Sequence, residues 1–185
     1  LAEPCTSFTM VHDGTTLYVA IRAAEPQLSL VKLETDESRF GASVDDRLEL
    51  FMDTTAQGDQ YLQLFVNSSG LSRRRLGEVR DDAFRLRLAV GSSDAGWTMA
   101  AAIPLSDLPL QALSTTWRFN LVRFRCLEGP DPALEISSFM PLKGHHVQFH
   151  AYPFAHVEGL DLAPYLWDVT TMGSPKLRKA GDSFA

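Results

Sequence analysis

Hydrophobic and polar residues alternate most clearly in the segment VDDRLELFMD, residues 44–53. After the two acids at 45 and 46, every second residue is apolar, which puts Leu48, Leu50 and Met52 on one face of a predicted strand. The other face carries Arg47, Glu49, Phe51 and Asp53. A carboxylate between an arginine and an aromatic ring is typical of a sheet face that holds a polar ligand. Elongated surface strands carry such charges too, so the pattern alone leaves both interpretations open.

Further alternating segments are separated by turn residues. We expect strands at residues 17–22, 61–67, 84–90, 97–103 and 117–126. Pro104 ends the fourth of these, because proline has no N–H to donate to a sheet, and residues 106–109 predict at most one helical turn. The basic run 73–75 lies near acidic residues, so we expect a solvated loop there. Many short strands and no long helix indicate an all-β fold, a single β-sandwich.

The chain length of 185 residues suits one domain with a hydrophobic core. We assign residues 1–160 to the sandwich. Residues 161–185 are interrupted by proline and glycine, which predicts a C-terminal extension lying on the domain. No apolar run approaches the ~20 residues that cross a bilayer, so we expect no membrane partner. Because the chain begins with Leu1 rather than Met, we interpret it as processed or trimmed, with no signal peptide left.

Net charge and cysteine content narrow the function further. The formal net charge of −6 argues against a nucleic-acid partner, which calls for a basic face. The two cysteines, Cys5 and Cys126, lack the CxxC spacing of zinc or redox motifs. They could form one long-range disulfide or remain two buried free thiols, and the sequence leaves both open.

Motifs for metal binding and catalysis are weak. The histidines at 145, 146, 150 and 156 do not have H-E-x-x-H spacing, so we expect loop histidines and no metal site. Asp45, Asp46 and Asp53 would suit a structural calcium ion, although not in an EF-hand loop. Nucleophile-elbow, P-loop and dinucleotide-binding motifs are absent. We therefore expect a noncatalytic protein without a cofactor.

Aromatic residues are frequent on the predicted loops and polar faces. Sugar-binding proteins use such rings because the C–H face of a pyranose packs on an aromatic plane while its hydroxyls take fixed polar partners. The same rings could instead fill the core of the sandwich. The residues concerned are Phe51, Tyr61, Phe65, Phe139, Phe149, Tyr152 and Phe154.

Several segments together resemble the family 9 carbohydrate-binding modules and their relatives in the DOMON-like superfamily. In chain order they are DGTTLYVA (13–20), DDRLELFMD (45–53), GWT (96–98) with AIP (102–104), WRFNLVR (117–123) and FHAYPF (149–154). The resemblance covers roughly residues 8–160. It implies an immunoglobulin-like, jelly-roll sandwich of two antiparallel sheets, in a noncatalytic module of a secreted or periplasmic protein.

The resemblance also implies binding residues. Glu49 matches the family's binding glutamate, Phe149 lies near a tryptophan that clamps the sugar, and His146 lies near a polar residue before it. With Arg47 and Gln63 from the polar faces, these residues form the expected site for a carbohydrate or other small polar ligand. Ser43 stands where the family has its other clamp tryptophan, and Phe65 where it has a binding arginine. Ala100 replaces a usual acid and Ala155 the closing glycine.

Two other functions remain open at this point. The domain could be a structural or docking domain without sugar binding, with residues 161–185 contacting a neighbouring domain. It could also be a heme- or small-molecule-binding relative, since the chain has five Met and five His, although none has a diagnostic spacing.

Overall fold

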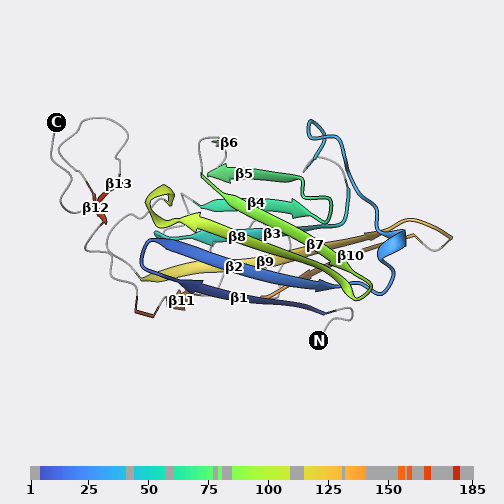
Figure 1. Cartoon of the computed structure of the whole chain (residues 1–185), viewed down its shortest axis with the longest axis horizontal. Helices are drawn as coiled ribbons and strands as arrows, with labels where there is room; N and C mark the ends of the chain where they lie inside the picture. The colour runs from blue at the N-terminus through green and yellow to red at the C-terminus, as the bar shows by residue number, and fades with distance from the viewer. Residues whose placement is uncertain are drawn as a thin grey trace.

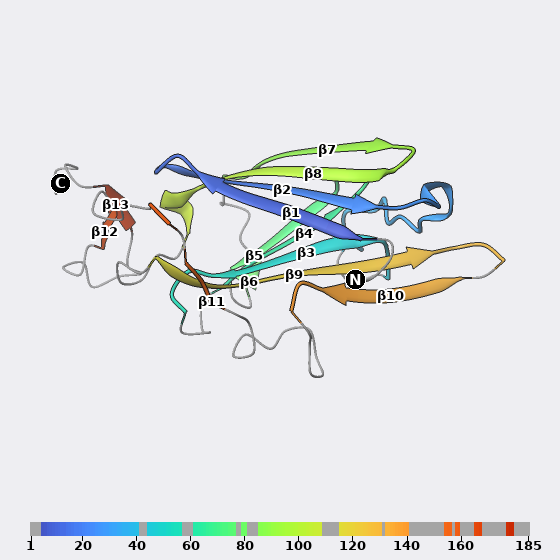
Figure 2. The same ribbon diagram turned by 90° about the horizontal axis from the view of Figure 1, so that it is seen from below.

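The computed structural model describes residues 5–40, 44–56, 61–76, 79–80, 85–108, 115–130, 132–140, 154–156, 158–159, 165–167 and 177–179. Within these ranges the chain forms strands and two short 3-10 turns, η1 (Leu28–Leu30) and η2 (Leu105–Asp107). The strands build two facing antiparallel sheets, seen edge-on as two layers in Figure 2. The predicted β-sandwich is confirmed.

The first sheet has four strands in the order β1-β2-β8-β7. Their bounds are β1 (Thr6–His12), β2 (Thr16–Ala24), β7 (Arg87–Ser93) and β8 (Gly96–Pro104). All four pair antiparallel with their neighbours, and Figure 1 shows them as one layer in blue and yellow-green.

The second sheet has the order β10-β9-β3-β4-β5-β6, with β11 pairing the start of β9. Its longer strands are β3 (Arg47–Asp53), β4 (Leu62–Asn67), β5 (Ser72–Leu76), β9 (Thr116–Leu127) and β10 (Ala133–Ser138). The shorter strands are β6 (Val79–Arg80) and β11 (Phe154–His156). β3 and β9 pair along the whole length of β3, so they form the centre of this sheet.

The main hydrophobic core lies between the sheets and is built from the apolar face of each strand. It includes Leu48, Leu50 and Met52 of β3, as the alternation predicted. Ile21 of β2 and Trp97 of β8 face them from the first sheet and are buried. Burying such side chains contributes about 1.5–3 kcal/mol each, so the pattern that sets the strand faces also drives the two sheets together.

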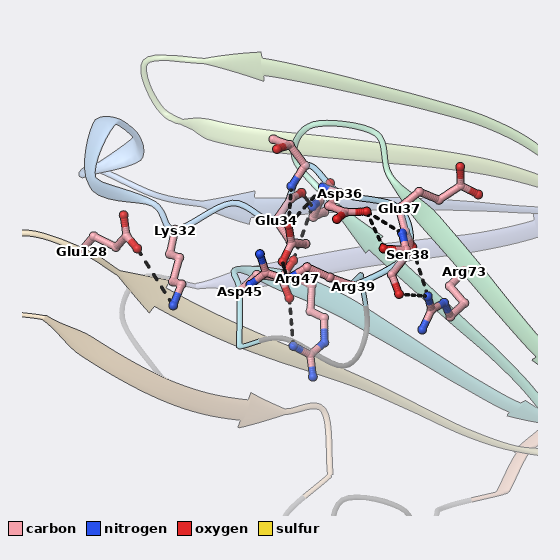
Figure 3. Close-up of polar contacts among 12 residues, drawn as sticks. Lys32, Glu34, Asp36, Glu37, Ser38, Arg39, Asp45, Arg47, Arg73 and Glu128 are labelled. Carbon is pink, nitrogen blue, oxygen red and sulfur yellow. Dashed lines mark hydrogen bonds and ion pairs between the residues drawn. The ribbon is translucent and has the colours of Figure 1, made fainter.

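The predicted loop at residues 73–75 is wrong. These arginines belong to β5, which pairs with β4 and extends the second sheet. Charged residues can occupy a strand near a sheet edge, where their heads find partners. The Arg73 guanidinium donates to the backbone carbonyl oxygens of Glu37 and Ser38, at 3.1 and 3.4 Å (Figure 3). The Arg75 guanidinium lies 5.3 Å from the centre of the Phe65 ring, a cation–π contact.

The turn between β7 and β8 is shorter than the gap between the predicted strands 84–90 and 97–103, because β7 continues to Ser93 and β8 begins at Gly96. Gly96 has φ +129°, a region that side chains rarely adopt. A Cβ atom there would crowd the carbonyl oxygen of Ala23 and lie 2.7 Å from the backbone nitrogen of Glu25. The hairpin therefore approaches the end of β2 at a point where only glycine fits.

Replacing Gly96 with Ala is expected to lower the free energy of unfolding by about 1–3 kcal/mol, because strain and crowding occur together. Urea unfolding checks this. Gly70→Ala is the matched control: Gly70 also has positive φ (+88°), but nothing lies within 4 Å of its added Cβ. The Gly96 variant should be the less stable of the two, and equal stabilities would contradict a role for close backbone approach.

The remaining described strands, β12 (Tyr165–Trp167) and β13 (Leu177–Lys179), form a separate antiparallel pair at one end of the sandwich in both views (Figures 1 and 2). Cys5 is exposed and Cys126 is buried, and both are free thiols. Among the described residues, no helix is long and apolar enough to pass through a membrane.

Candidate ligand-binding site

The predicted binding strand β3 lies at the centre of a buried polar face. Antiparallel register places Glu49 of β3 beside Phe65 of β4 and Val122 of β9, and Gln63 beside Phe51. The pattern of β3 suggested a face that holds a ligand or a charged surface strand, but all seven β3 residues are buried, and Glu49 is 0 % exposed. The outward residues of β4, including Gln63, are buried as well. This half of the sheet is therefore an interior surface on both sides.

Three predicted site residues come together in one hydrogen-bonded group. The Arg47 Nε–H donates to Glu49 Oε1 at 2.8 Å, and the Gln63 Nε2–H donates to Glu49 Oε2 at 3.0 Å. Each oxygen of the carboxylate is thus held by a donor from a different direction. Burial of an ionised carboxylate is tolerated only with such pairing.

Asp45 extends this group toward the loop before β3. The Arg47 Nη1–H donates to Asp45 Oδ1 at 3.0 Å, a contact that Figure 3 shows as a dashed line. The Asn67 amide donates to the Glu34 carbonyl oxygen at 2.9 Å and reaches Asp45 Oδ2 at 3.4 Å. Burial raises the pKa of Asp45 above its usual value, while the hydrogen bond from Arg47 acts in the opposite direction.

Aromatic and aliphatic side chains surround the polar group on the same face. Phe51, Tyr61, Val122 and Phe124 form a second buried cluster, separate from the main core. The Arg47 guanidinium lies 4.1 Å from the centre of the Phe124 ring. Of the rings that could hold a sugar, Phe51 and Tyr61 therefore fill this second core.

A second polar cluster crosses the gap between the sheets. Arg123 of β9 donates through Nη2 to Glu25 Oε2 at 3.0 Å and through Nη1 to the Ala24 carbonyl oxygen at 2.7 Å. The Arg125 Nε–H donates to Glu25 Oε2 at 2.7 Å. Asp46 Oδ1 accepts from the Trp97 indole at 3.1 Å, and its Oδ2 lies 3.5 Å from Arg123 Nη2.

Asp46 is the most perturbed acid of this second cluster. Burial raises its pKa from 3.8 to about 6, against the opposing effect of the Arg123 charge. Glu25, Arg123 and Arg125 are not among the site residues predicted from the sequence. The available signal was in the β9 alternation, which places both arginines on the face of Phe119 and Leu121, where apolar residues are expected.

The acids considered for calcium already have partners in the protein. Asp45 and Asp46 belong to the two clusters above, and Asp53 Oδ1 accepts from the backbone N–H and hydroxyl of Thr55 at 3.0 and 2.7 Å. Within the described part of the chain, no three His, Cys, Asp or Glu residues group as metal ligands would.

Phe149, His146 and Ser43 lie outside the described residues, as do His145 and His150. The structure therefore brings Glu49, Gln63 and Arg47 together, and the expected roles of Phe149 and His146 stay predictions. Ala100 of β8 pairs with Ala20 and Ala89 in the first sheet, far in the fold from the Glu49 group.

No protein-family model matches the sequence, and no curated protein matches it. Among solved structures, the fold is similar to a family 9 carbohydrate-binding module from Caldicellulosiruptor kristjanssonii. In complex with glucose, that module matches with a TM-score of 0.62 and 17 % identity over 84 % of this chain and 78 % of its own. In complex with cellotriose, the values are 0.62 and 18 %, over 84 % and 76 %.

A protein from Bacteroides uniformis, named as a candidate carbohydrate-binding protein, matches with a TM-score of 0.55 and 17 % identity, over 80 % of this chain and 76 % of its own. The resemblance to family 9 modules is therefore confirmed at the level of the fold.

Proposed function

We propose that this protein is a noncatalytic carbohydrate-binding-module-like domain that binds a glycan or related polar ligand on the Glu49 side of its second sheet. Glu49, Gln63 and Arg47 would hold the hydroxyls, with Phe149 as the aromatic partner and His146 as a further polar group. The observation that carries the proposal is the Glu49 carboxylate, held from two sides on a fold shared with sugar-bound modules.

The geometry suits recognition of a hydroxyl rather than a reaction. A carboxylate accepts hydrogen bonds with fixed direction, and bonds to a charged acceptor are about twice as strong as neutral ones. Arg47 and Gln63 set the orientation of Glu49 in advance, which lowers the entropy that binding costs. In a buried site of low dielectric, each such bond is stronger than in water.

Burial of Glu49 sets the expected strength of binding. A sugar reaches this carboxylate only after the packing around it opens, and that opening subtracts from the binding free energy. We therefore expect dissociation constants in the millimolar range, equivalent to about 4 kcal/mol.

The proposed function carries two broader assignments. A module of this kind would bind glycans outside the cell. We therefore assign the protein to the secreted or periplasmic space. We also propose that residues 161–185 form an extension of the 1–160 sandwich, available for contact with a neighbouring domain.

Isothermal titration with glucose and cello-oligosaccharides tests the proposal. We expect millimolar binding by the native chain and about tenfold weaker binding by Glu49→Gln, which keeps the shape of the side chain but removes its charge. Glu128→Gln is the control with the same charge change. The Glu128 side chain is exposed, and its ion pair with Lys32 Nζ is long, at 4.0 Å. Its affinity should equal that of the native chain.

Two results would contradict the proposal. Either no sugar binds at millimolar concentration, or Glu49→Gln binds sugar as tightly as the Glu128→Gln control. Thermal unfolding of both variants shows whether the folded state is retained, so that a loss of binding is attributed to the carboxylate.

A further inference from the structure

A separate cleft opens where the edges of the two sheets meet. β1 is the outermost strand of the first sheet, and β10 is the outermost strand of the second. Between them lies a cavity of about 170 Å³. This is the volume of roughly five or six water molecules, or of one small ring. Its lining residues are Cys5, Thr6, Phe8, Leu121, Arg123, Ser137, Ser138 and Phe139.

Two residues that line this edge cleft carry buried polar atoms without a hydrogen-bond partner among the described residues. These atoms are Arg123 Nε and Thr6 Oγ1. Arg123 is 2 % exposed, and Ser137 stands directly opposite it in the β9–β10 register. Native proteins rarely leave a buried donor of this kind unpaired. Both atoms lie in residues of the cleft wall but are closed to solvent, so a bound molecule reaches them only if the Thr6 and Arg123 side chains shift toward the cleft.

An aromatic ring stands at the mouth of the same cleft. Phe139 is 54 % exposed although it is a large apolar side chain. Its ring packs edge-on against Phe8, with the centres 5.1 Å apart, and Phe8 in turn contacts Phe119 at 5.0 Å. Phe139 is thus held in place by rings beneath it while much of its surface faces outward. A held, exposed ring beside polar groups suits the C–H face of a ring-shaped polyol.

The charges around the cleft favour a neutral ligand. The Arg123 guanidinium is already neutralised by Glu25 at 3.0 Å and lies 3.5 Å from Asp46. Arg123 and Arg125 are balanced by these two acids, so the cleft offers an anion no excess positive charge, whereas a hydroxyl oxygen can accept from Arg123 Nε without adding charge.

We propose that this edge cleft is a binding site for a neutral polyol ring, such as one monosaccharide unit, distinct from the Glu49 site. The hydroxyl oxygens of the ligand take the Arg123 Nε–H and the Thr6 hydroxyl, and its C–H face packs on Phe139. The site is independent of the proposed function, because none of its residues belongs to the Glu49 group.

The experiment follows the Arg123 Nε–H signal by ¹H–¹⁵N NMR during titration with glucose, myo-inositol and acetate, up to about 50 mM to cover millimolar affinities. A saturable shift with the two polyols and none with acetate is expected. Thr6→Val and Phe139→Ala should each weaken the response about fivefold to tenfold, the effect of one lost hydrogen bond or ring contact. Ile136→Ala is the matched control, since Ile136 lies on β10, which ends one residue before Phe139, and is as exposed as Phe139.

The Glu49→Gln variant separates the two sites and should keep the Arg123 response in full. The proposal is overturned if neither polyol shifts the signal, which would leave the cleft to water alone, or if acetate shifts it instead. It is equally overturned if Thr6→Val and Phe139→Ala respond like Ile136→Ala, or if Glu49→Gln abolishes the response.

Discussion

Replacing Arg123 with Met is expected to lower the free energy of unfolding by about 3–5 kcal/mol, the largest effect of any change described above. Arg123 is almost fully buried and donates to Glu25 and to the Ala24 carbonyl oxygen, which join β9 to the end of β2. Without the guanidinium, Glu25 keeps only its contacts to Arg125 and its neighbours, and Asp46 loses its nearest positive charge. Removing Arg123 leaves Arg125 to compensate Glu25 and leaves Asp46 without its ion-pair partner, in a medium of low dielectric.

A surface ion pair provides the control. Arg85 Nη2 lies 2.7 Å from Asp107 Oδ1, closer than Arg123 lies to Glu25, but the Arg85 side chain is 72 % exposed. Arg85→Met should cost less than about 1 kcal/mol, because water screens the pair. Chemical denaturation of both variants measures the difference. If the two substitutions prove equally costly, distance rather than burial governs these contacts and the interpretation fails.

The second large effect concerns pH and Asp46. Because burial raises its pKa in the folded state to about 6, while 3.8 is the ordinary value, the folded protein binds this proton more tightly than the unfolded chain does. The contribution of Asp46 to stability is therefore greatest below pH 4 and is lost as pH rises through about 6. The two pKa values differ by roughly two units, which corresponds to about 3 kcal/mol.

Asp46→Asn isolates this contribution, because asparagine keeps the acceptor for the Trp97 indole but cannot ionise. We expect the stability of the variant relative to the native chain to increase by up to about 3 kcal/mol from pH 4 to pH 7. Urea unfolding of both proteins at several pH values measures it, and other titrating groups cancel in the difference. A difference that does not change with pH would show that Asp46 keeps one protonation state throughout.

Much of the fold is predictable from the sequence because a strand's side chains alternate. The strand Arg47–Asp53 lies within the alternating segment 44–53, and in the strand predicted at 117–126 Phe119 and Leu121 lie on the opposite side from Val122 and Phe124, as alternation requires. The basic run at 73–75 was assigned wrongly, because local charge suggests a loop whereas pairing with β4 makes it a strand. β4 ends at Asn67 and β5 begins at Ser72, so the pairing is a local hairpin, but the charge of the run gives no sign of it because strand formation here depends on the partner strand.

The candidate site is predictable only in part for the same reason. Glu49, Gln63 and Arg47 were each placed on an outward face. Arg47 and Glu49 are neighbours on the same face of β3, and the pairing of β3 with β4 brings Gln63 into hydrogen-bonding distance of Glu49. The inter-sheet group of Glu25 and Arg123 spans 98 positions in sequence. No spacing rule predicts a contact of that range, and only the packing of the two sheets creates it.

The sequence by itself determined which residues share a face of β3, because the period of two is a property of the extended backbone. It did not determine what each face meets. The face with Arg47, Glu49, Phe51 and Asp53 has the polar pattern of a surface, yet the folded chain buries it completely. Tertiary structure decided this, since burial of charged groups becomes tolerable only when partners from neighbouring strands, such as Gln63 of β4, satisfy them.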